Sequence, residues 1–125
     1  MHENEISKIV LDSCYLIHSN LGPGLFESVY ENILSFELKN KGLKIERQIP
    51  IEVRWRGLLF ENAFRADLIV EDKVLIELKS VETLSKVHYK QVMTYLKLTD
   101  LKLGLLINFN ENLIRDGIKR IVNGL

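Results

Sequence analysis

The sequence predicts an α/β fold in which helices flank a mixed β-sheet. Two early segments have the 3.6-residue apolar spacing of helices, the middle of the chain alternates like strands, and a third helical pattern precedes a short apolar run. The expected order is helix, helix, three or four strands, helix, strand. A chain of 125 residues with 46% hydrophobic content can bury one proper core. We therefore expect a single domain, residues 1–125.

Two helices are expected in the first third of the chain. Residues 3–19 place their apolar side chains on one helical stripe, and the sequence LGPG at 21–24 ends that helix. A second helix is expected from about residue 25 to residue 40, where the Lys-Gly pair at 41–42 closes it.

Strands are expected from residue 44 onward. Residues 45–55 alternate between apolar and polar, and Gly57 offers a turn into the run at 58–60. Two further apolar runs, FRADLIV at 64–70 and VLIELKS at 74–80, are joined by 71–73 and read as a hairpin.

The third helix and the last strand follow this hairpin. Residues 84–98 return to helical spacing, and 103–109 form a short apolar run fit for a buried strand. A right-handed crossover through the helix would return this strand beside the hairpin. The tail, residues 110–125, carries no clear pattern.

The hairpin sets ionisable groups into apolar strands. If residues 71–73 form a three-residue turn, then Asp67 faces Glu77 and Arg65 faces Lys79. Alternation predicts that one hairpin face is wholly apolar and belongs to the core. That face would carry Phe64, Ala66, Leu68, Val70, Val74, Ile76 and Leu78.

Two opposed carboxylates in the middle of buried strands repel each other. A hard cation with oxygen ligands would cancel that repulsion, which makes Asp67 and Glu77 candidate metal ligands. The alternative is a solvent-facing side of the hairpin, on which Lys79 and Arg65 neutralise the acids.

Composition excludes several classes of protein. The 17 Lys and Arg balance the 17 Asp and Glu, so no global positive charge indicates a nucleic-acid binder and any such contact must be local. Cys14 is the only cysteine, which favours a reducing, cytoplasmic location. No apolar stretch approaches a membrane span, and the polar start MHENEISK is unlike a signal sequence.

The hairpin resembles the core motif of the PD-(D/E)XK nuclease superfamily. Asp67 is followed after nine residues by Glu77-Leu78-Lys79, and the order of elements is similar over roughly residues 20–110. Three other acid-x-Lys triplets, ending at Lys39, Lys73 and Lys102, fall on a helix, a turn and a loop. Ala66 stands where the motif usually has proline. The resemblance implies a restriction-endonuclease-like fold.

Two shorter patterns strengthen this resemblance. Residues 24–30 read G-x-x-E-x-x-Y, similar to the signature of a group of small stand-alone proteins placed in this superfamily. Residues 91–95 read Q-x-x-x-Y, similar to a motif of RecB-type nucleases. Both patterns occur in the expected order around the hairpin.

The resemblance implies a role for each site residue. Asp67 and Glu77 would ligate Mg²⁺ or Mn²⁺, and Lys79 would orient the attacking water and steady the phosphate charge of the transition state. Glu27 would complete the metal's shell, directly or through water. An acid near the start of a helix is, however, favoured by the helix dipole in any protein.

Gln91 and Tyr95 are four residues apart and share a helix face, with His88 on the same stripe. Gln91 would assist catalysis by supporting Lys79, and Tyr95 would contact substrate. The alternative is an ordinary amphipathic helix with an inward tyrosine. Elsewhere, Arg54, Trp55 and Arg56, and the lysines at 86, 90 and 97, could grip nucleic acid; we interpret them as solvated surface.

These inferences give two hypotheses for function. The first is a metal-dependent nuclease that hydrolyses phosphodiester bonds of nucleic acid, with DNA favoured over RNA. The second is a weak or inactive nuclease-fold module that binds nucleic acid or protein. A homodimer would be a natural way to cut both strands, with the C-terminal segment as its interface.

Overall fold

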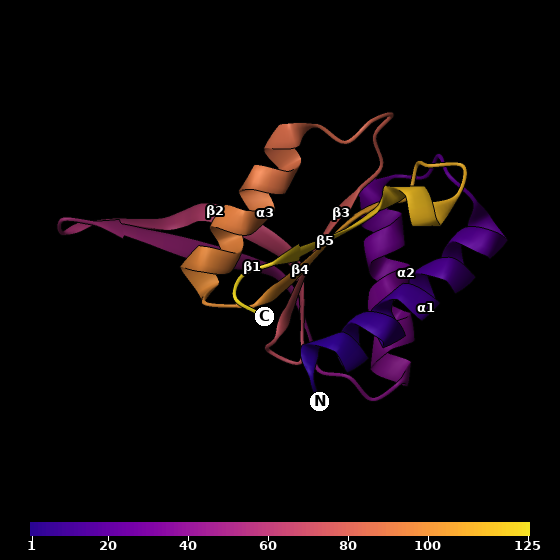
Figure 1. Cartoon of the computed structure of the whole chain (residues 1–125), viewed down its shortest axis with the longest axis horizontal. Coiled ribbons are helices and arrows are strands. Elements are labelled where there is room, and N and C mark those ends of the chain that lie inside the picture. The colour runs from indigo at the N-terminus through magenta and orange to yellow at the C-terminus, as the bar shows by residue number, and fades with distance from the viewer.

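A computed structural model describes residues 1–125 as three helices, five strands and one 3₁₀ helix, η1 (Figure 1). Their bounds are α1 Glu3–Leu21, α2 Glu27–Asn40, β1 Ile45–Trp55, β2 Leu58–Val70, β3 Val74–Lys79, α3 Lys86–Thr99, β4 Leu103–Asn108, η1 Ile114–Gly117 and β5 Ile118–Val122. None of the helices is long and apolar enough to cross a membrane.

The five strands form one mixed sheet in the order β1-β2-β3-β4-β5. β3 and β4 pair in parallel, from Val74 with Leu103 to Lys79 with Asn108, and every other neighbouring pair is antiparallel. A parallel pair needs a crossover connection, which α3 supplies. The expected return of the last apolar run beside the hairpin is confirmed.

The sheet has a helix layer on each face. The larger core cluster joins α1, α2 and η1 to one face and includes Tyr30, Leu34 and Phe109. The smaller cluster packs Val92 and Leu96 of α3 on the opposite face. Figure 1 shows α1 and α2 together beside the sheet and α3 lying apart from them. The predicted α/β architecture is therefore confirmed, with the carboxylate strand β3 in the middle of the sheet.

Close packing of α3 depends on a glycine in β4. A Cβ built on Gly104 would lie 2.7 Å from Cγ1 of Val92 and 3.3 Å from Cδ1 of Leu96. Real side-chain atoms do not approach so closely, so only glycine lets this helix lie directly on the strand.

The alternation predicted for the hairpin holds only in part. Leu68 and Val70 pack in the larger core as expected, but Phe64 and Ala66 pack with α3 on the opposite face. The prediction of one continuous apolar face was wrong because the alternation of β2 breaks between Ala66 and Leu68. Opposite this break lies Gln48, whose φ of 49° is left-handed.

Other differences concern where elements begin and end. The run at 58–60 and the first hairpin run form one 13-residue strand, β2, and α2 begins at Glu27, two residues later than expected. The tail, which had no clear pattern, adds η1 and the edge strand β5. The sequence pattern of β5 is weak because this strand is short and has no fully buried residue.

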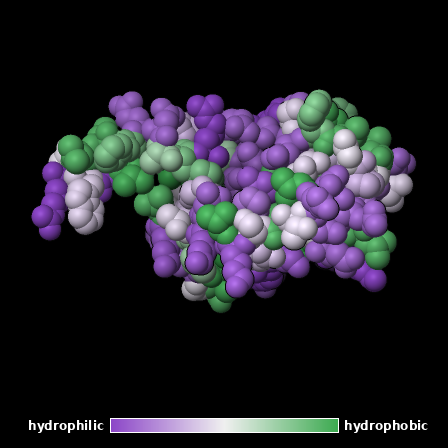
Figure 2. All heavy atoms as spheres, turned by 90° about the horizontal axis from the view of Figure 1, so that it is seen from above, coloured by the Kyte–Doolittle hydropathy of each residue, from purple (hydrophilic) through white to green (hydrophobic).

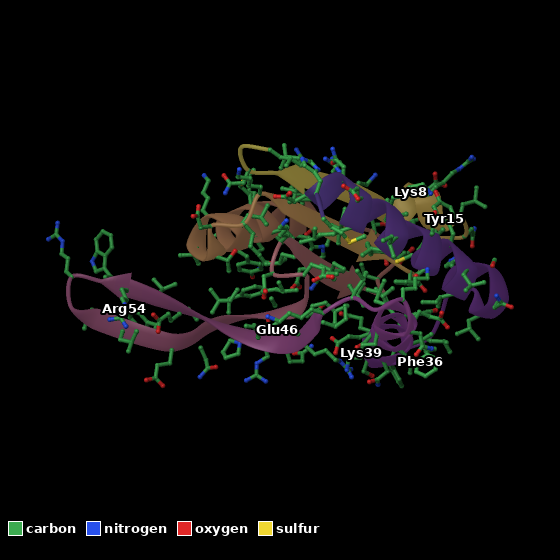
Figure 3. All side chains as sticks on the ribbon, turned by 90° about the horizontal axis from the view of Figure 1, so that it is seen from below. Lys8, Tyr15, Phe36, Lys39, Glu46 and Arg54 are labelled. Atoms are coloured by element: carbon green, nitrogen blue, oxygen red, sulfur yellow. The ribbon has the colours of Figure 1, made fainter.

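The distal parts of β1 and β2 project from the body as a two-stranded arm, residues 52–61. Figure 3 shows this arm, with Arg54 on it, extending beyond the end of α3. Its turn consists of Arg56 and Gly57, with φ of 45° and 86°, as two-residue hairpin turns prefer. No third strand pairs with the arm, because β3 ends at Lys79.

Candidate active site

Asp67 and Glu77 lie opposite each other where the β2–β3 ladder ends. The paired residues run from Val70 with Val74 to Leu68 with Ile76, which confirms the predicted register. Beyond them, the backbone N–H of Asp67 donates to Oε1 of Glu77 at 3.0 Å, and the N–H of Leu78 donates to Oδ2 of Asp67 at 2.9 Å. The two carboxylates therefore fix each other's strands.

Burial makes this pair costly to ionise. Glu77 is only 5% exposed, and desolvation together with the nearby Asp67 charge raises its pKa to about 8. Desolvation also raises the pKa of Asp67, and the Glu31 charge adds to that rise. The surroundings therefore disfavour a negative charge on both carboxyl groups at once.

The alternative of a solvent-facing, ion-paired hairpin face does not match this geometry. Glu77 is buried, and none of the chain's salt bridges joins Lys79 or Arg65 to Asp67 or Glu77. The carboxylates accept backbone N–H bonds instead. Their charge is thus left without a bonded cationic partner.

Lys79 is the last residue of β3 and is half-buried. Its charge lowers the pKa of both Asp67 and Glu77, although burial outweighs this effect in each case. Its carbonyl accepts the N–H of Phe109 at 2.9 Å, which anchors the strand end to the segment after β4. The structure therefore brings the predicted acid pair and lysine together.

The loop after Lys79 is held by a residue that the sequence analysis did not single out. Asn108 is fully buried, and its side chain accepts the N–H of Val81 at 3.1 Å and donates to the carbonyl of Val81 at 2.8 Å. Ser80 Oγ donates to the carbonyl of Leu25 at 2.7 Å. These bonds fix the exit from β3 against β4 and against the segment that leads into α2.

Glu27 is the first residue of α2 and is exposed. Its charge adds slightly to the raised pKa of Glu77, less than burial or the Asp67 charge does. The α2 residue that connects to Asp67 is Glu31, one turn further along. Gln48 donates to Glu31 Oε1 at 2.6 Å and to Asp67 Oδ1 at 3.2 Å, and so bridges the two acids.

Glu31 is itself buried, and Arg47 Nη2 donates to its Oε2 at 2.9 Å. The sequence analysis missed this network. The available signal was helical spacing, because Glu31 lies four residues after Glu27 and such residues share a helix face. Tyr30, the last residue of the G-x-x-E-x-x-Y pattern, stacks on Phe109 and donates to the carbonyl of Gly22 at 2.6 Å. That tyrosine positions the start of α2.

Gln91 and Tyr95 differ in their relation to the acid pair. Tyr95 stacks on Phe64 of β2, and its pKa is raised by burial and by the Glu77 charge, so it lies close to the carboxylates. Gln91 is exposed, and its side chain makes no hydrogen bond within the protein. His88 accepts the Ser85 N–H at 3.1 Å, a structural role at the start of α3. The assigned functions of Gln91 and Tyr95 remain predictions.

The donor set at the acid pair suits a hard divalent cation. Carboxylate oxygens are the ligands that Mg²⁺ and Mn²⁺ prefer, and a cation would offset the repulsion that raises both pKa values. Oε2 of Glu77 accepts no hydrogen bond from the protein, so one oxygen of the buried carboxylate is free to ligate. No group of three or more His, Cys, Asp or Glu converges on such a position.

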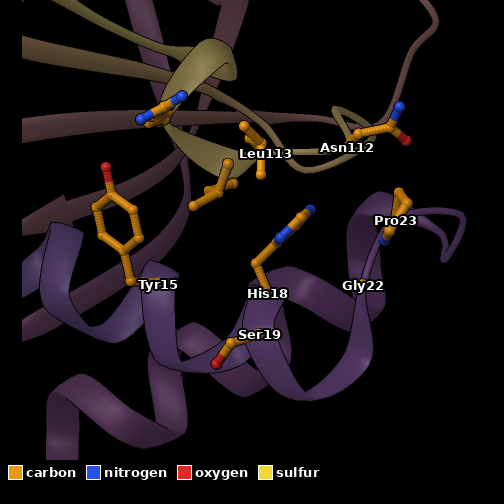
Figure 4. A pocket seen from close by; sticks show the side chains of 9 residues that line it. Tyr15, His18, Ser19, Gly22, Pro23, Asn112 and Leu113 are labelled. Atoms are coloured by element: carbon orange, nitrogen blue, oxygen red, sulfur yellow. The ribbon is translucent and has the colours of Figure 1, made fainter.

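Two surface hollows lie at other residues. The larger, of about 670 Å³, lies between α1 and the segment before β5 (Figure 4). It is lined by Tyr15, His18, Ser19, Gly22, Pro23, Asn112, Leu113, Ile114 and Arg115. The second, of about 540 Å³, is lined by Leu84, Lys86, Tyr89 and Lys90 at the start of α3. None of the predicted site residues lines either hollow.

Comparison with known families gives one match. The model of a family described as the PD-(D/E)XK nuclease superfamily matches residues 4–121, which is nearly the whole chain. Comparison with curated proteins and with solved structures finds no significant match. The narrower group with the G-x-x-E-x-x-Y signature stays a prediction.

Proposed function

The chain belongs to the PD-(D/E)XK nuclease superfamily, and on that basis we propose that it hydrolyses phosphodiester bonds of nucleic acid, with DNA as its substrate. One observation carries this proposal. A buried glutamate, Glu77, faces a second carboxylate, Asp67, and has a pKa of about 8, with Lys79 following on the same strand. Such paired, perturbed groups are typical of catalytic sites.

Asp67 and Glu77 would hold Mg²⁺ or Mn²⁺, with Glu27 completing the shell directly or through water. When bound, the cation would supply Lewis-acid stabilisation of the phosphate and a more acidic water. Deprotonation of Glu77 would be coupled to binding of the cation, because both need the same carboxylate oxygens. The bonds that Asp67 and Glu77 accept from backbone N–H groups hold these oxygens in place.

Lys79 would orient the attacking water and stabilise the negative charge that grows on the phosphate as the new P–O bond forms and the leaving oxygen departs. Its half-buried position makes that charge less screened than on an exposed lysine. Gln91 would support Lys79 or a phosphate from the exposed face of α3, and Tyr95, beside Glu77, would contact substrate.

The proposal is tested by cleavage of supercoiled plasmid and of single-stranded DNA, each with Mg²⁺ or Mn²⁺. The wild type, Lys79→Ala and Lys102→Ala are compared. Lys102 is exposed and ends another acid-x-Lys triplet, Asp100-Leu101-Lys102, so its variant is a matched control for charge and local sequence. We expect Lys79→Ala to lose at least about 100-fold in rate, since electrostatic stabilisation of this kind contributes that much in other enzymes.

Lys79→Ala should still bind Mn²⁺, because its acids are intact, and Lys102→Ala should cleave at the wild-type rate. An unchanged rate in Lys79→Ala would contradict the catalytic assignment. If the protein cleaved RNA but not DNA, the proposed substrate would be wrong and the proposed active site would still hold. Absence of any cleavage by the wild type would favour the second function.

That second function is a weak or inactive nuclease-fold module that binds nucleic acid or protein. The observation in its favour is the zero net charge, with 17 basic and 17 acidic residues, because nucleic-acid affinity rests mainly on positive charge. Fluorescence anisotropy with labelled DNA at two salt concentrations distinguishes the two functions. A binding module would bind DNA but would not cleave it with any metal ion. In that case Lys79→Ala would weaken DNA binding by no more than the loss of one phosphate contact.

A further inference from the structure

Gln48 of β1 lies opposite Asp67 of β2, and both strands change faces at this pair. The residues that flank Gln48 pair with those that flank Asp67. Ile45 packs against the larger core cluster, beside α1 and α2, whereas Ile49 packs against the smaller cluster under α3. β2 changes faces in step with β1. Beyond the pair both strands continue into the arm, where hydrophobic side chains gather at the surface (Figure 2). The candidate metal ligand thus lies at an irregular point of the ladder.

The backbone of Gln48 is strained at this point. Its φ of 49° lies in the left-handed region, which is unfavourable for a residue with a Cβ. Gln48 is exposed, so burial of its side chain does not compensate this cost. Strain of this kind clusters at functional sites, where it holds a group in position. The group that it holds here is the side-chain amide.

The amide of Gln48 links two acids from different elements. Its Nε2 donates to Glu31 Oε1 at 2.6 Å and to Asp67 Oδ1 at 3.2 Å. The shorter bond fixes the amide to α2, and the longer bond reaches the candidate ligand. Glutamine suits this position because its amide group carries two donor hydrogens and no charge, so it can bond both acids without competing electrostatically with a cation.

Glu31 is held as an anchor for this amide rather than as a ligand. It is buried, and Arg47 donates to its Oε2 at 2.9 and 3.2 Å while Gln48 donates to its Oε1. Arg47 also donates to the side chain of Asn32, the next residue of α2. The guanidinium therefore balances the charge of Glu31. The amide thus extends from an ion-paired carboxylate to Asp67, which has no bonded cationic partner.

Asp67 is held at both of its carboxylate oxygens. Oδ1 accepts the bond from Gln48, and Oδ2 accepts the N–H of Leu78 at 2.9 Å. Bonds to both oxygens restrict rotation about the terminal torsion of the side chain, which is otherwise broad. Each oxygen keeps a second lone pair with which it can ligate a cation. Loss of the Gln48 bond would release this rotation and spread the ligand over several orientations.

We propose that Gln48 is a positioning residue, which holds the Asp67 carboxylate in the orientation that binds the divalent cation, with Glu31 and Arg47 fixing the amide in turn. The inference rests on the proposed metal site and adds to it a residue of β1. Groups that orient metal ligands typically contribute 10–100-fold in metal affinity. Gln48 itself would touch neither the cation nor the phosphate.

Gln48→Ala and Gln48→Gly test this role, because both remove the amide and only glycine relieves the left-handed backbone. Titration calorimetry with Mn²⁺ alone measures affinity, and thermal unfolding in chelator measures stability. We expect both variants to bind Mn²⁺ about 10–100-fold more weakly than the wild type, and to the same extent as each other. Gln48→Gly should nevertheless have a Tm roughly 3–6 °C above that of Gln48→Ala.

The matched control is the same pair of substitutions at Asp100. This residue is exposed and also left-handed, with a φ of 58°, and it lies at the end of α3. Asp100→Gly should have a higher Tm than Asp100→Ala by a similar amount, and both should bind Mn²⁺ like the wild type. If affinity only followed backbone stability, it would differ between alanine and glycine at both positions.

Equal Mn²⁺ affinity in the wild type and Gln48→Ala would overturn the inference and leave the proposed metal site in place. An affinity that recovers in Gln48→Gly together with the stability would also overturn it, because Gln48 would then act through the fold alone. A wild type that binds no Mn²⁺ overturns the inference together with the metal site. None of these measurements uses nucleic acid, so their results are independent of the nuclease assay.

Discussion

Asp67 and Glu77 are joined through the backbone rather than through a cation: the N–H of Asp67 donates to Glu77 Oε1 at 3.0 Å, while the Asp67 carboxylate accepts the N–H of Leu78. This arrangement holds two carboxyl groups together without a bonded cationic partner. The pKa of each is raised, that of Glu77 to about 8. The site is thus arranged for a ligand at the expense of stability.

Glu77→Gln should stabilise the metal-free protein at alkaline pH. Between the ordinary glutamate pKa of 4.5 and the folded value of about 8, the folded state keeps a proton that the unfolded state releases. The free energy of unfolding therefore falls as pH rises through this window and stays low above it. The loss at pH 8.5 is on the order of 4 kcal/mol. Glutamine retains the carbonyl that accepts the Asp67 N–H.

Urea unfolding of wild type and Glu77→Gln at pH 5 and pH 8.5 measures this effect, in buffers with chelator. The matched control is Glu82→Gln, at an exposed position in the loop after β3, which should behave like the wild type. Equal pH dependence in wild type and Glu77→Gln would contradict the raised pKa.

Mn²⁺ binding should strengthen with pH and release a proton. A cation must displace the proton from Glu77, whose pKa is about 8. Affinity should therefore rise by about 50-fold between pH 6 and pH 8, in proportion to the ionised fraction. Titration calorimetry in buffers with different ionisation enthalpies counts the proton. Asp67→Ala should abolish binding, and a pH-independent affinity in the wild type would count against Glu77 as a ligand.

Asn108→Ala should destabilise the protein by about 1–3 kcal/mol, because it leaves the half-buried N–H and carbonyl of Val81 without their side-chain partner. The loop at 80–85 should also become mobile, which hydrogen exchange detects as faster exchange at Val81. Asn112→Ala, at an exposed asparagine, serves as the control and should change neither the stability nor the exchange rate at Val81. Unchanged exchange at Val81 in Asn108→Ala would show that other contacts hold the loop.

Gly104→Ala should cost about 1–3 kcal/mol, since the new Cβ would lie 2.7 Å from Cγ1 of Val92. Val92→Ala alone should also destabilise, by leaving a cavity under α3. Together the two changes should cost less than their sum, because the smaller residue makes room for the new methyl group. Thermal or urea unfolding of the wild type, the two single variants and the double variant measures these free energies. Strictly additive losses would mean that α3 shifts to make room for the new methyl group.

The sequence was sufficient for features that depend on local spacing. The three-residue turn at 71–73 sets the register of the β2–β3 hairpin, so the opposition of Asp67 and Glu77 followed from counting along two strands. Helical periodicity likewise located α1 and α3. Lys79 followed because it shares the strand with Glu77.

Features set by docking of distant segments were not predictable in this way. Gln48 meets Glu31 across 17 residues, and Asn108 meets Val81 across 27, and both contacts depend on how helices and strands pack. The break in alternation after Ala66 depends on the left-handed Gln48 opposite, which no pattern of apolar residues reveals. The apolar and polar residues of the arm alternate as in any strand. The arm is exposed only because α3 does not extend over it.

The order of strands in the sheet, β1-β2-β3-β4-β5, is the order in which they occur along the chain. Each strand after β1 therefore pairs with the strand that precedes it along the chain, although β4 reaches β3 only after the α3 crossover. Only nine residues separate Asp67 from Glu77, so the local β2–β3 hairpin is sufficient to bring the two acids opposite each other, whereas α3 follows later in the chain. Opposition of the two acids is thus a local event, and the electrostatic cost of burying them arises only when the helices pack on the sheet.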